Sequence, residues 1–457
     1  MVVGTTCQIV ALYTLLLLSS CNVLPSNNDP SIDNQPTIEA NQEGVIKEIK
    51  KADTPTYKYV IDENFKEFLP TYQEFASKMA YEYVDSYKED ENISISPLSI
   101  YMALAMANKC SDNETEKQIS NALNTTTDKL DLNMKSFLDL CYKEYYEEDY
   151  LKKENVLIAS EELSNSIWFN NNLDVKEDCL QELASNYYVD SYYADFSSNP
   201  TSVSKEISKF IENKTKGLIK PTLEFSEDTA MVILNTLYLK DLWNNYGYDL
   251  NYTSNEYSFK NIDNSITKSK FLSGYYNQGR VYNEESFSHF YTKTNNNFKL
   301  KFIVPSEGYS IYDVFTKENI MKVTQMKDYN TFDHENKLQY QTKVIFPEYE
   351  TSCDKVINEL LKERFGIVDL FTEGVCDFSS ISDVDMYCNM IKHISKLQVN
   401  KKGIEGAAVT IMEMCGEAAP SEEYKIVTEE FLVDKAFGFV LIDRYDIPVF
   451  SGIVTNI

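Results

Sequence analysis

The spacing of apolar residues predicts helices in the first part of the chain and strands in the second. Tyr72, Phe75, Ala76, Met79 and Tyr83 fall on one face of a helix. The later part carries apolar runs bounded by polar residues, which is typical of strands. Helices followed by strands, without regular alternation of the two, indicate an α+β fold. The predicted strands are Met231–Lys240, Phe298–Pro305, Thr342–Pro347, Ile391–Val399 and Phe437–Asp443.

Two further segments of the early part have their own patterns. The segment Asn92–Leu98 predicts a short strand that leads into a helix near Pro97, where a first helical turn tolerates proline. Residues Tyr142–Asn155 are a run of Tyr, Glu and Lys, and we interpret them as the solvated face of a helix.

The first residues of the chain indicate export. Ile9–Leu18 is an apolar core that is too short to span a bilayer as a mature helix, and it ends in Leu-Ser-Ser-Cys. These four residues resemble a bacterial lipoprotein cleavage box, in which lipidated Cys21 becomes the first mature residue. No Lys or Arg precedes the apolar run, so a plain secretory signal and a mis-assigned start codon remain as alternatives.

The domain boundaries follow from composition. Residues 1–21 are the predicted signal peptide, and residues 22–56 are rich in Asn, Pro, Ser and charge, which predicts a flexible tether. Residues 57–457 contain no internal repeat and no linker, which predicts one large domain. We therefore expect an extracellular protein, either secreted or anchored to the cell surface through Cys21.

Charge and cysteine content exclude several classes of function. The 457 residues carry a net charge of −28, so nucleic acid is not expected as a partner. The same charge opposes binding to anionic membranes, which leaves a lipid anchor as the only expected membrane contact. The nine cysteines include no Cys-x-x-Cys pair, so no zinc ribbon or thioredoxin motif is present, and we expect most of them to be buried thiols.

The residues of catalysis are sparse. The chain has three histidines and lacks Gly-x-Ser-x-Gly, His-Glu-x-x-His, phosphate-loop and Gly-x-Gly-x-x-Gly motifs. We therefore expect no enzyme activity, no cofactor and no metal site.

One short segment has the composition of a loop that is able to become a strand. It reads Gly403, Ile404, Glu405, Gly406, Ala407, Ala408, Val409 and Thr410, and it follows the predicted strand Ile391–Val399. Such small and β-branched residues fit between the strands of a sheet without steric clash.

This segment is similar to the hinge of the serpin family, which reads roughly Gly-Thr-Glu-Ala-Ala-Ala-Ala-Thr. Lys401 departs from the family pattern, because an acid paired with a basic residue is common there, and a weaker anchor is expected. Other segments resemble family motifs in the same order, although Asp241 stands where Gly is usual. These segments are Asn92–Ile100, Thr215–Ile219, Leu234–Trp243, Phe346–Pro347, Asp377–Ile381, Ala436–Phe439 and Val449–Val454.

The resemblance implies a serpin-like α+β fold with a large central mixed sheet, two smaller sheets, about nine helices and an exposed reactive loop. It implies a monomeric suicide inhibitor of serine proteases, with cysteine proteases as a second target class, that traps its target as a covalent acyl-enzyme while the cleaved loop inserts into the central sheet. The alternative is a non-inhibitory serpin that acts as a binding or chaperone-like module. Residues Ser96, Ser99, Asn235, His393 and Trp243 match the family's cluster where the central strands part.

Two ways of counting give two predictions for the bond that the protease cleaves. Counting forward from Gly403 by the usual loop length gives Glu417-Ala418. Counting back from the strand at Glu430 gives Lys425-Ile426, so the loop is longer than usual. Each extra strand residue adds about 3.3 Å of slack, and slack weakens the pull on an acylated protease. We therefore favour Glu417-Ala418 and keep the second bond as the alternative.

Overall fold

The structure is a computed structural model. It describes residues 45–55, 60–88, 91–141, 143–149, 154–243, 250–276, 280–327, 332–404 and 424–457. Part of the hinge, the favoured cleavage site and Cys21 lie outside these residues. In the described part of the chain, no helix is long and apolar enough to cross a membrane.

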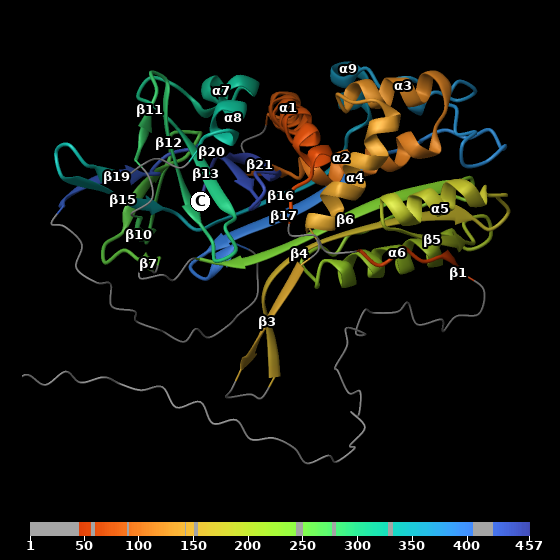
Figure 1. Cartoon of the computed structure of the whole chain (residues 1–457), viewed down its shortest axis with the longest axis horizontal. Coiled ribbons are helices and arrows are strands. Elements are labelled where there is room, and N and C mark those ends of the chain that lie inside the picture. Colours follow the sequence, from red (N-terminus) through yellow and green to blue (C-terminus); the bar gives the residue numbers. More distant parts are fainter. Residues whose placement is uncertain are drawn as a thin grey trace, which may run out of the picture. The chain divides into compact units, whose positions relative to one another are not determined.

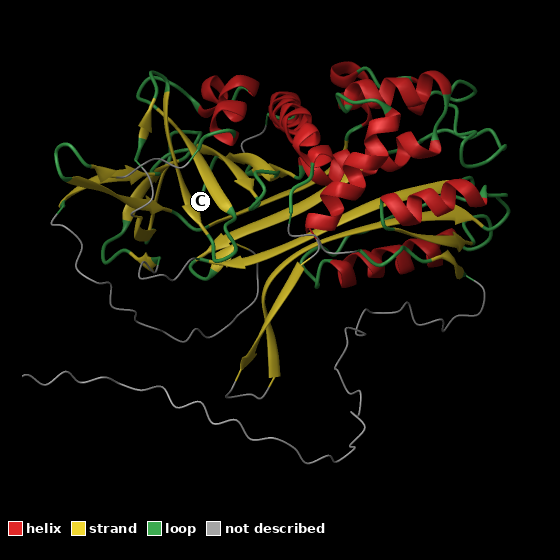
Figure 2. Cartoon of the chain, viewed as in Figure 1, coloured by secondary structure: helices red, strands yellow, loops and turns green. Residues whose placement is uncertain are grey.

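The described residues contain nine α-helices, which agrees with the expected number. Figure 2 shows the helices in red and the strands in yellow. The face predicted from Tyr72 to Tyr83 is buried in the first of them. The second begins at Pro97 as predicted, directly after a short strand, and the Ser96 hydroxyl accepts the Ser99 N–H at its N-terminus. The helices are α1 (Glu63–Ser86), α2 (Pro97–Cys110), α3 (Asn113–Ala122), α4 (Thr127–Cys141), α5 (Glu177–Asn186), α6 (Pro200–Lys214), α7 (Ile311–Val314), α8 (Lys317–Thr324) and α9 (Asn358–Phe365), with a short 3₁₀ turn η1 (Asp369–Phe371).

One large mixed sheet runs through the domain (Figure 1). Its first half is the central sheet, and its second half continues through a single parallel contact between Ser352 and Ile93. In spatial order the strands are β1 (Ile46–Lys50), β5 (Val189–Ala194), β4 (Glu154–Asn170), β6 (Met231–Leu242), β18 (Gly403–Ile404), β17 (Lys392–Asn400), β16 (Tyr349–Val356), β2 (Ile93–Ile95), β21 (Pro448–Val454), β20 (Phe437–Ile442), β13 (Lys299–Pro305), β12 (Phe287–Lys293) and β11 (Tyr282–Asn283), and β3 (Lys143–Asp149) pairs with β4.

Two smaller sheets complete the α+β fold, as expected. The first contains β14 (Phe332–Asp333), β15 (Leu338–Phe346), β10 (Leu272–Tyr276), β7 (Asn251–Tyr252) and β19 (Lys425–Leu432), and the second contains β8 (Tyr257–Lys260) and β9 (Ile266–Ser269). All five predicted strands of the later part are present as β6, β13, β15, β17 and β20, with small shifts at their ends.

Three predictions from the sequence are wrong. The described residues of the segment Tyr142–Asn155, which are 143–149 and 154–155, form strands and not a helix, because β3 and the start of β4 form an antiparallel ladder there. Strands β4 and β5 also precede α6, so the helices do not all come before the strands. Folded structure begins earlier than Tyr57, because β1 within the predicted tether pairs with β5 at the edge of the central sheet. In all three cases a partner strand satisfies the backbone, and the local pattern does not show that partner.

Helices cover both faces of the central sheet. On one face, Phe210 of α6 packs edge-on against Trp168 of β4, with 5.4 Å between ring centroids, and Trp168 stacks on Tyr192 of β5. On the other face, α2 packs against both β6 and β21. Helix α2 therefore contacts both halves of the sheet.

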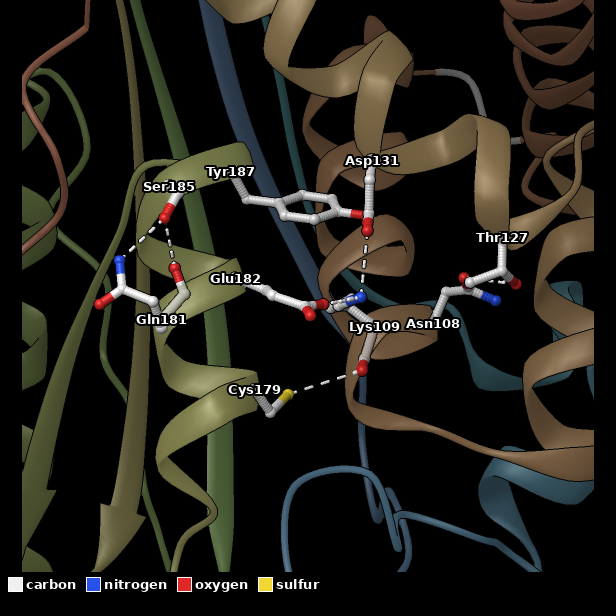
Figure 3. Close-up of polar contacts among 9 residues, drawn as sticks. All are labelled: Asn108, Lys109, Thr127, Asp131, Cys179, Gln181, Glu182, Ser185 and Tyr187. Atoms are coloured by element: carbon white, nitrogen blue, oxygen red, sulfur yellow. Dashed lines mark hydrogen bonds and ion pairs between the residues drawn. The ribbon is translucent and has the colours of Figure 1, made fainter.

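A polar network fastens the end of α2 to α4 and α5 (Figure 3). Lys109 of α2 forms ion pairs with Asp131 of α4 and Glu182 of α5, and the Tyr187 hydroxyl donates to Asp131 at 2.6 Å. The Cys179 thiol lies 3.6 Å from the Lys109 carbonyl oxygen. Among the described cysteines, Cys110, Cys179 and Cys353 are buried and Cys376 and Cys388 half-buried, all as free thiols.

Candidate functional site

The first two hinge residues already form a strand within the central sheet. Gly403 and Ile404 pair with Leu242 and Asp241 of β6 on one side. On the other side they pair with Asn400 and Val399 of β17. We call these six residues the hinge seat. The Ile404 side chain is 1% exposed, so the seat buries a large apolar group.

Gly403 is required by a close approach of two backbones. A Cβ atom at this position would lie 2.1 Å from the Asp241 carbonyl oxygen and 2.8 Å from the Leu242 Cα. Both neighbours are backbone atoms of a paired strand, so neither can move aside cheaply. Any other residue would therefore separate β18 from β6.

Beyond Ile404, towards Met231 of β6 and Lys392 of β17, the described residues place no strand between β6 and β17. Ladder pairs join β18 to β6 and to β17, and none joins β6 to β17 directly within the described residues. The edge of β6 from Met231 to Lys240 and the edge of β17 from Lys392 to Gln398 thus lack a strand partner in this part of the structure. We call the space between these two edges the sheet gap.

Trp243 is hydrogen-bonded to the chain on either side of the turn that leads into the hinge seat. Its indole N–H donates to the Asn400 carbonyl oxygen at 2.7 Å, and its ring packs edge-on against Phe346 at 5.9 Å. Its backbone N–H donates to the Lys402 carbonyl oxygen at 3.3 Å. Trp243 therefore lies next to the first hinge residues, as the resemblance to the family motif predicted.

Asp241, the residue that departs from the family pattern, binds the turn between β12 and β13 to the hinge seat. Its carboxylate accepts the backbone N–H and the side-chain amide of Asn296 at 2.9 and 3.0 Å, and the Leu242 N–H at 3.0 Å. Burial nevertheless raises the pKa of this carboxyl above its usual value. A glycine here would leave these donors without the carboxylate.

The sequence predicted that the start of the loop is weakly held at Lys401, because the acidic residue common in the family is missing there. In the structure this position is held by its backbone N–H and by a carboxylate from another part of the chain. The Lys401 backbone N–H donates to the Glu348 carboxylate at 2.7 Å, and the Tyr252 hydroxyl donates to the same oxygen at 3.0 Å. The Lys401 ammonium lies 5.4 Å from the centre of the Tyr252 ring. The carboxylate thus comes from the turn between β15 and β16, a position that hinge spacing alone does not reveal.

Only some residues of the cluster predicted where the central strands part are in contact with one another. The Ser96 backbone N–H donates to the His393 Nε2 at 3.1 Å, across the junction between α2 and β17. Burial lowers the pKa of His393 to about 4, so the imidazole is neutral and accepts at Nε2. Asn235 instead donates to the Asn165 side chain at 2.7 Å, on the β4 side of the sheet gap.

Sequence reasoning missed two members of this cluster. The Ser395 hydroxyl donates to the Ser94 carbonyl oxygen at 2.8 Å, and the Asn165 amide donates to the Tyr187 carbonyl oxygen at 2.7 Å. The alternation of buried and half-buried positions in β17 marks Ser395 as facing inward. Asn165 lies on β4, a strand that the sequence did not predict, so no signal pointed to it.

The two predicted cleavage sites differ in what the structure describes. Glu417-Ala418 lies outside the described residues. Lys425 and Ile426 are the first residues of β19, where they pair with Leu338 and Gln339 of β15. The Lys425 N–H donates to the Lys337 carbonyl oxygen at 2.9 Å, so the alternative bond is part of a sheet.

Comparison with known proteins identifies the family. A sequence model described as Serpin (serine protease inhibitor) matches residues 70–457, which is most of the chain. The chain belongs to the serpin family, whose members generally inhibit proteases rather than catalyse reactions. A serpin-like protein of Methanosarcina acetivorans is 27% identical over 374 residues, covering 78% of this chain and 79% of that protein. Human neuroserpin is 24% identical over 370 residues, covering 78% of this chain and 83% of neuroserpin.

Solved structures show the same fold. The native state of tengpin, a thermophilic serpin, superposes with a TM-score of 0.69 at 23% identity, over 89% of this chain and 98% of tengpin. Thyroxine-binding globulin in complex with thyroxine superposes with a TM-score of 0.66 at 18% identity, over 86% of this chain and 99% of that chain. The second structure shows that the serpin fold also carries binding functions.

Proposed function

We propose that this protein is a suicide inhibitor of serine proteases whose cleaved loop inserts into the sheet gap between β6 and β17. The observation that carries the proposal is the hinge seat, where Gly403 and Ile404 already occupy the start of that gap. The reactive loop therefore needs only to extend an existing strand, which is easier than nucleating a new one.

The register of the hinge seat assigns the rest of the hinge. Continued without a bulge, residues 405–411 would pair with β17 from Gln398 back to Lys392, and residues 405–414 with β6 from Lys240 back to Met231. The edges of the sheet gap are thus long enough for the whole hinge. Insertion would form ladder hydrogen bonds on both sides and bury the inward side chains, which supplies the driving force.

The same register decides which hinge residues face the core. Ile404 faces inward, and successive strand residues alternate between faces, so Gly406, Ala408 and Thr410 follow it inward. Ala408 would lie between Ser395 and Leu237, which are 4% and 7% exposed. A small residue fits this position, and this favours insertion over a purely carrier-like function.

The chemistry needs only the protease's own nucleophile. The serine hydroxyl of the protease attacks the Glu417 carbonyl carbon, the bond to Ala418 breaks, and the new amine leaves with a proton. The loop then remains esterified to the protease while its hinge inserts. We favour this bond because Lys425-Ile426 is held in β19, whereas a protease needs an extended and unpaired substrate.

The test is a covalent complex together with a change in stability. An elastase-like or Glu-preferring serine protease should give an SDS-resistant band of inhibitor plus protease. After a verified single cut in the loop, the melting temperature should rise by more than about 10 °C, because a strand has been added. A cleaved protein with an unchanged melting curve and no SDS-resistant band would instead support the non-inhibitory alternative.

A further inference from the structure

Three buried carboxylates and one half-buried guanidinium lie at or close to the hinge seat, to which Asp241 itself belongs. Glu161 on β4, Asp241 on β6 and Asp443 after β20 are 2%, 1% and 0% exposed. The Arg444 guanidinium donates to Glu161 at 3.2 Å. We call these four residues the acid cluster.

The cluster carries more negative charge than its one cation balances. Asp443 accepts the N–H groups of Tyr445 and Ile447 through one oxygen, both at 2.8 Å. The other Asp443 oxygen and one Glu161 oxygen are buried and have no hydrogen-bond partner within the described structure. Buried carboxylates in such surroundings hold a proton far more readily than carboxylates in water.

Two more charged residues lie beside the cluster. Asp446, in the same turn, adds to the raised pKa of Asp443, and Lys299 of β13 pairs with Asp446 at 3.5 Å. Burial, and then repulsion by Asp443, raises the pKa of Glu161, while burial raises that of Asp443 to about 7. In the described residues the carboxylates do not form a group that could hold a metal ion.

The acid cluster is connected to the hinge seat by the strand ladder. Asp241 is the ladder partner of Ile404, and Glu161 lies on β4, which pairs with β6 along most of its length. Through Arg444, Glu161 also ties β4 to the turn between β20 and β21. The cluster therefore joins β4, which pairs with the β6 edge of the sheet gap, to the turn between β20 and β21.

We propose that the acid cluster is a proton-operated latch on loop insertion. While Asp443 is protonated, the β20–β21 turn packs against β4 and holds β6 in place. When Asp443 loses its proton, a further negative charge stands in the core near Glu161 and Asp241, the turn is pushed from β4, and β6 moves more easily to admit the loop. This latch rests on the proposed insertion function and makes it faster above neutral pH.

The size of the effect follows from the titration of Asp443. A group with a pKa of about 7 is ionised in roughly a tenth of the molecules at pH 6 and in roughly nine tenths at pH 8. If ionised molecules alone admit the strand, insertion should be about ninefold faster at pH 8 than at pH 6.

The experiment uses the full chain and a synthetic peptide of residues 405–416, whose incorporation is followed by native gel and by the rise in melting temperature. The unmodified protein should incorporate the peptide about ninefold faster at pH 8 than at pH 6. Asp443→Asn should be slow and show no such increase. The matched control is Asp446→Asn, in the same turn but half exposed, which should keep the increase with pH. The increase should only move to slightly lower pH, because Asp446 contributes to the raised pKa of Asp443.

Each outcome decides between the two proposals. Equal pH dependence in Asp443→Asn and in the unmodified protein would overturn the latch and leave insertion standing. A peptide that never incorporates would overturn the latch, and the SDS-resistant complex with a protease would then decide separately whether the inhibitor function fails. If Asp443→Asn does not fold, Glu161→Gln serves instead, and its urea stability relative to the unmodified protein should rise as the pH increases from 5 to 8.

Discussion

A charge placed on the inward face of the hinge should convert the inhibitor into a substrate. If the hinge extends the register of β18 into the sheet gap as proposed, Ala408 would lie on that face, between Ser395 and Leu237, and Ala407 would lie on the opposite face beside Lys396. The Lys396 side chain is 30% exposed, so an arginine at 407 can reach water. Ala408→Arg and Ala407→Arg therefore differ only in the face that carries the guanidinium.

The expected magnitude comes from the cost of an unpaired charge in the core. A buried charge without a partner costs about 3–5 kcal/mol, and each 1.4 kcal/mol is a factor of about ten in rate. If most of this cost is present when the hinge passes between β6 and β17, insertion slows at least about 100-fold. Acylation involves residues far along the loop and should proceed at its normal rate.

The assay is the number of inhibitor molecules consumed per protease inactivated. This number is one plus the ratio of the deacylation rate to the insertion rate, and Ala408→Arg should raise that ratio at least about 100-fold. An unmodified protein that consumes about 1.1 molecules per protease would then consume on the order of 10, and one that consumes about 2 would consume on the order of 100. Ala407→Arg should stay close to the unmodified protein. If Ala408→Arg inhibits as well as the unmodified protein, the register taken from the hinge seat is wrong. If both variants fail equally, the two faces do not differ as proposed.

Three further predictions follow from the same structure and sequence. Glu417→Arg should redirect inhibition towards trypsin-like proteases, and mass spectrometry of the released peptide should find Ala418 at its start; a peptide that begins after Lys425 would favour the alternative bond. His393 has its pKa lowered to about 4 by burial, so the unfolded state binds the extra proton, and stability should fall by on the order of 3 kcal/mol as the pH drops from about 6.5 to 4. Urea unfolding of His393→Gln should lose that part of the pH dependence, and an unchanged slope would contradict it. We also propose that Cys21 carries a lipid anchor, so Cys21→Ala should abolish partitioning into detergent, and a mature protein that is soluble and starts elsewhere would refute the anchor.

Much of the fold could be predicted because the relevant signals are local. The apolar stripe from Tyr72 to Tyr83 identifies α1, and Pro97 after a short apolar run places the start of α2. The small residues from Gly403 onwards mark a loop that is able to enter a sheet. These features depend on side-chain spacing and backbone freedom, which the sequence displays directly.

What the sequence did not determine depends on partners distant in the chain. Whether Glu154–Asn170 is a strand depends on β6 and β5, because polar residues such as Asn165 interrupt its apolar pattern. The sequence likewise shows Glu161 and Asp443 only as two acids among 71 acidic residues. Tertiary structure alone buries them close to the hinge seat and removes the water that would otherwise keep both ionised. Local composition therefore determined that the hinge has the residues of a strand, and long-range packing decided where its first two residues pair and which charges lie close to them.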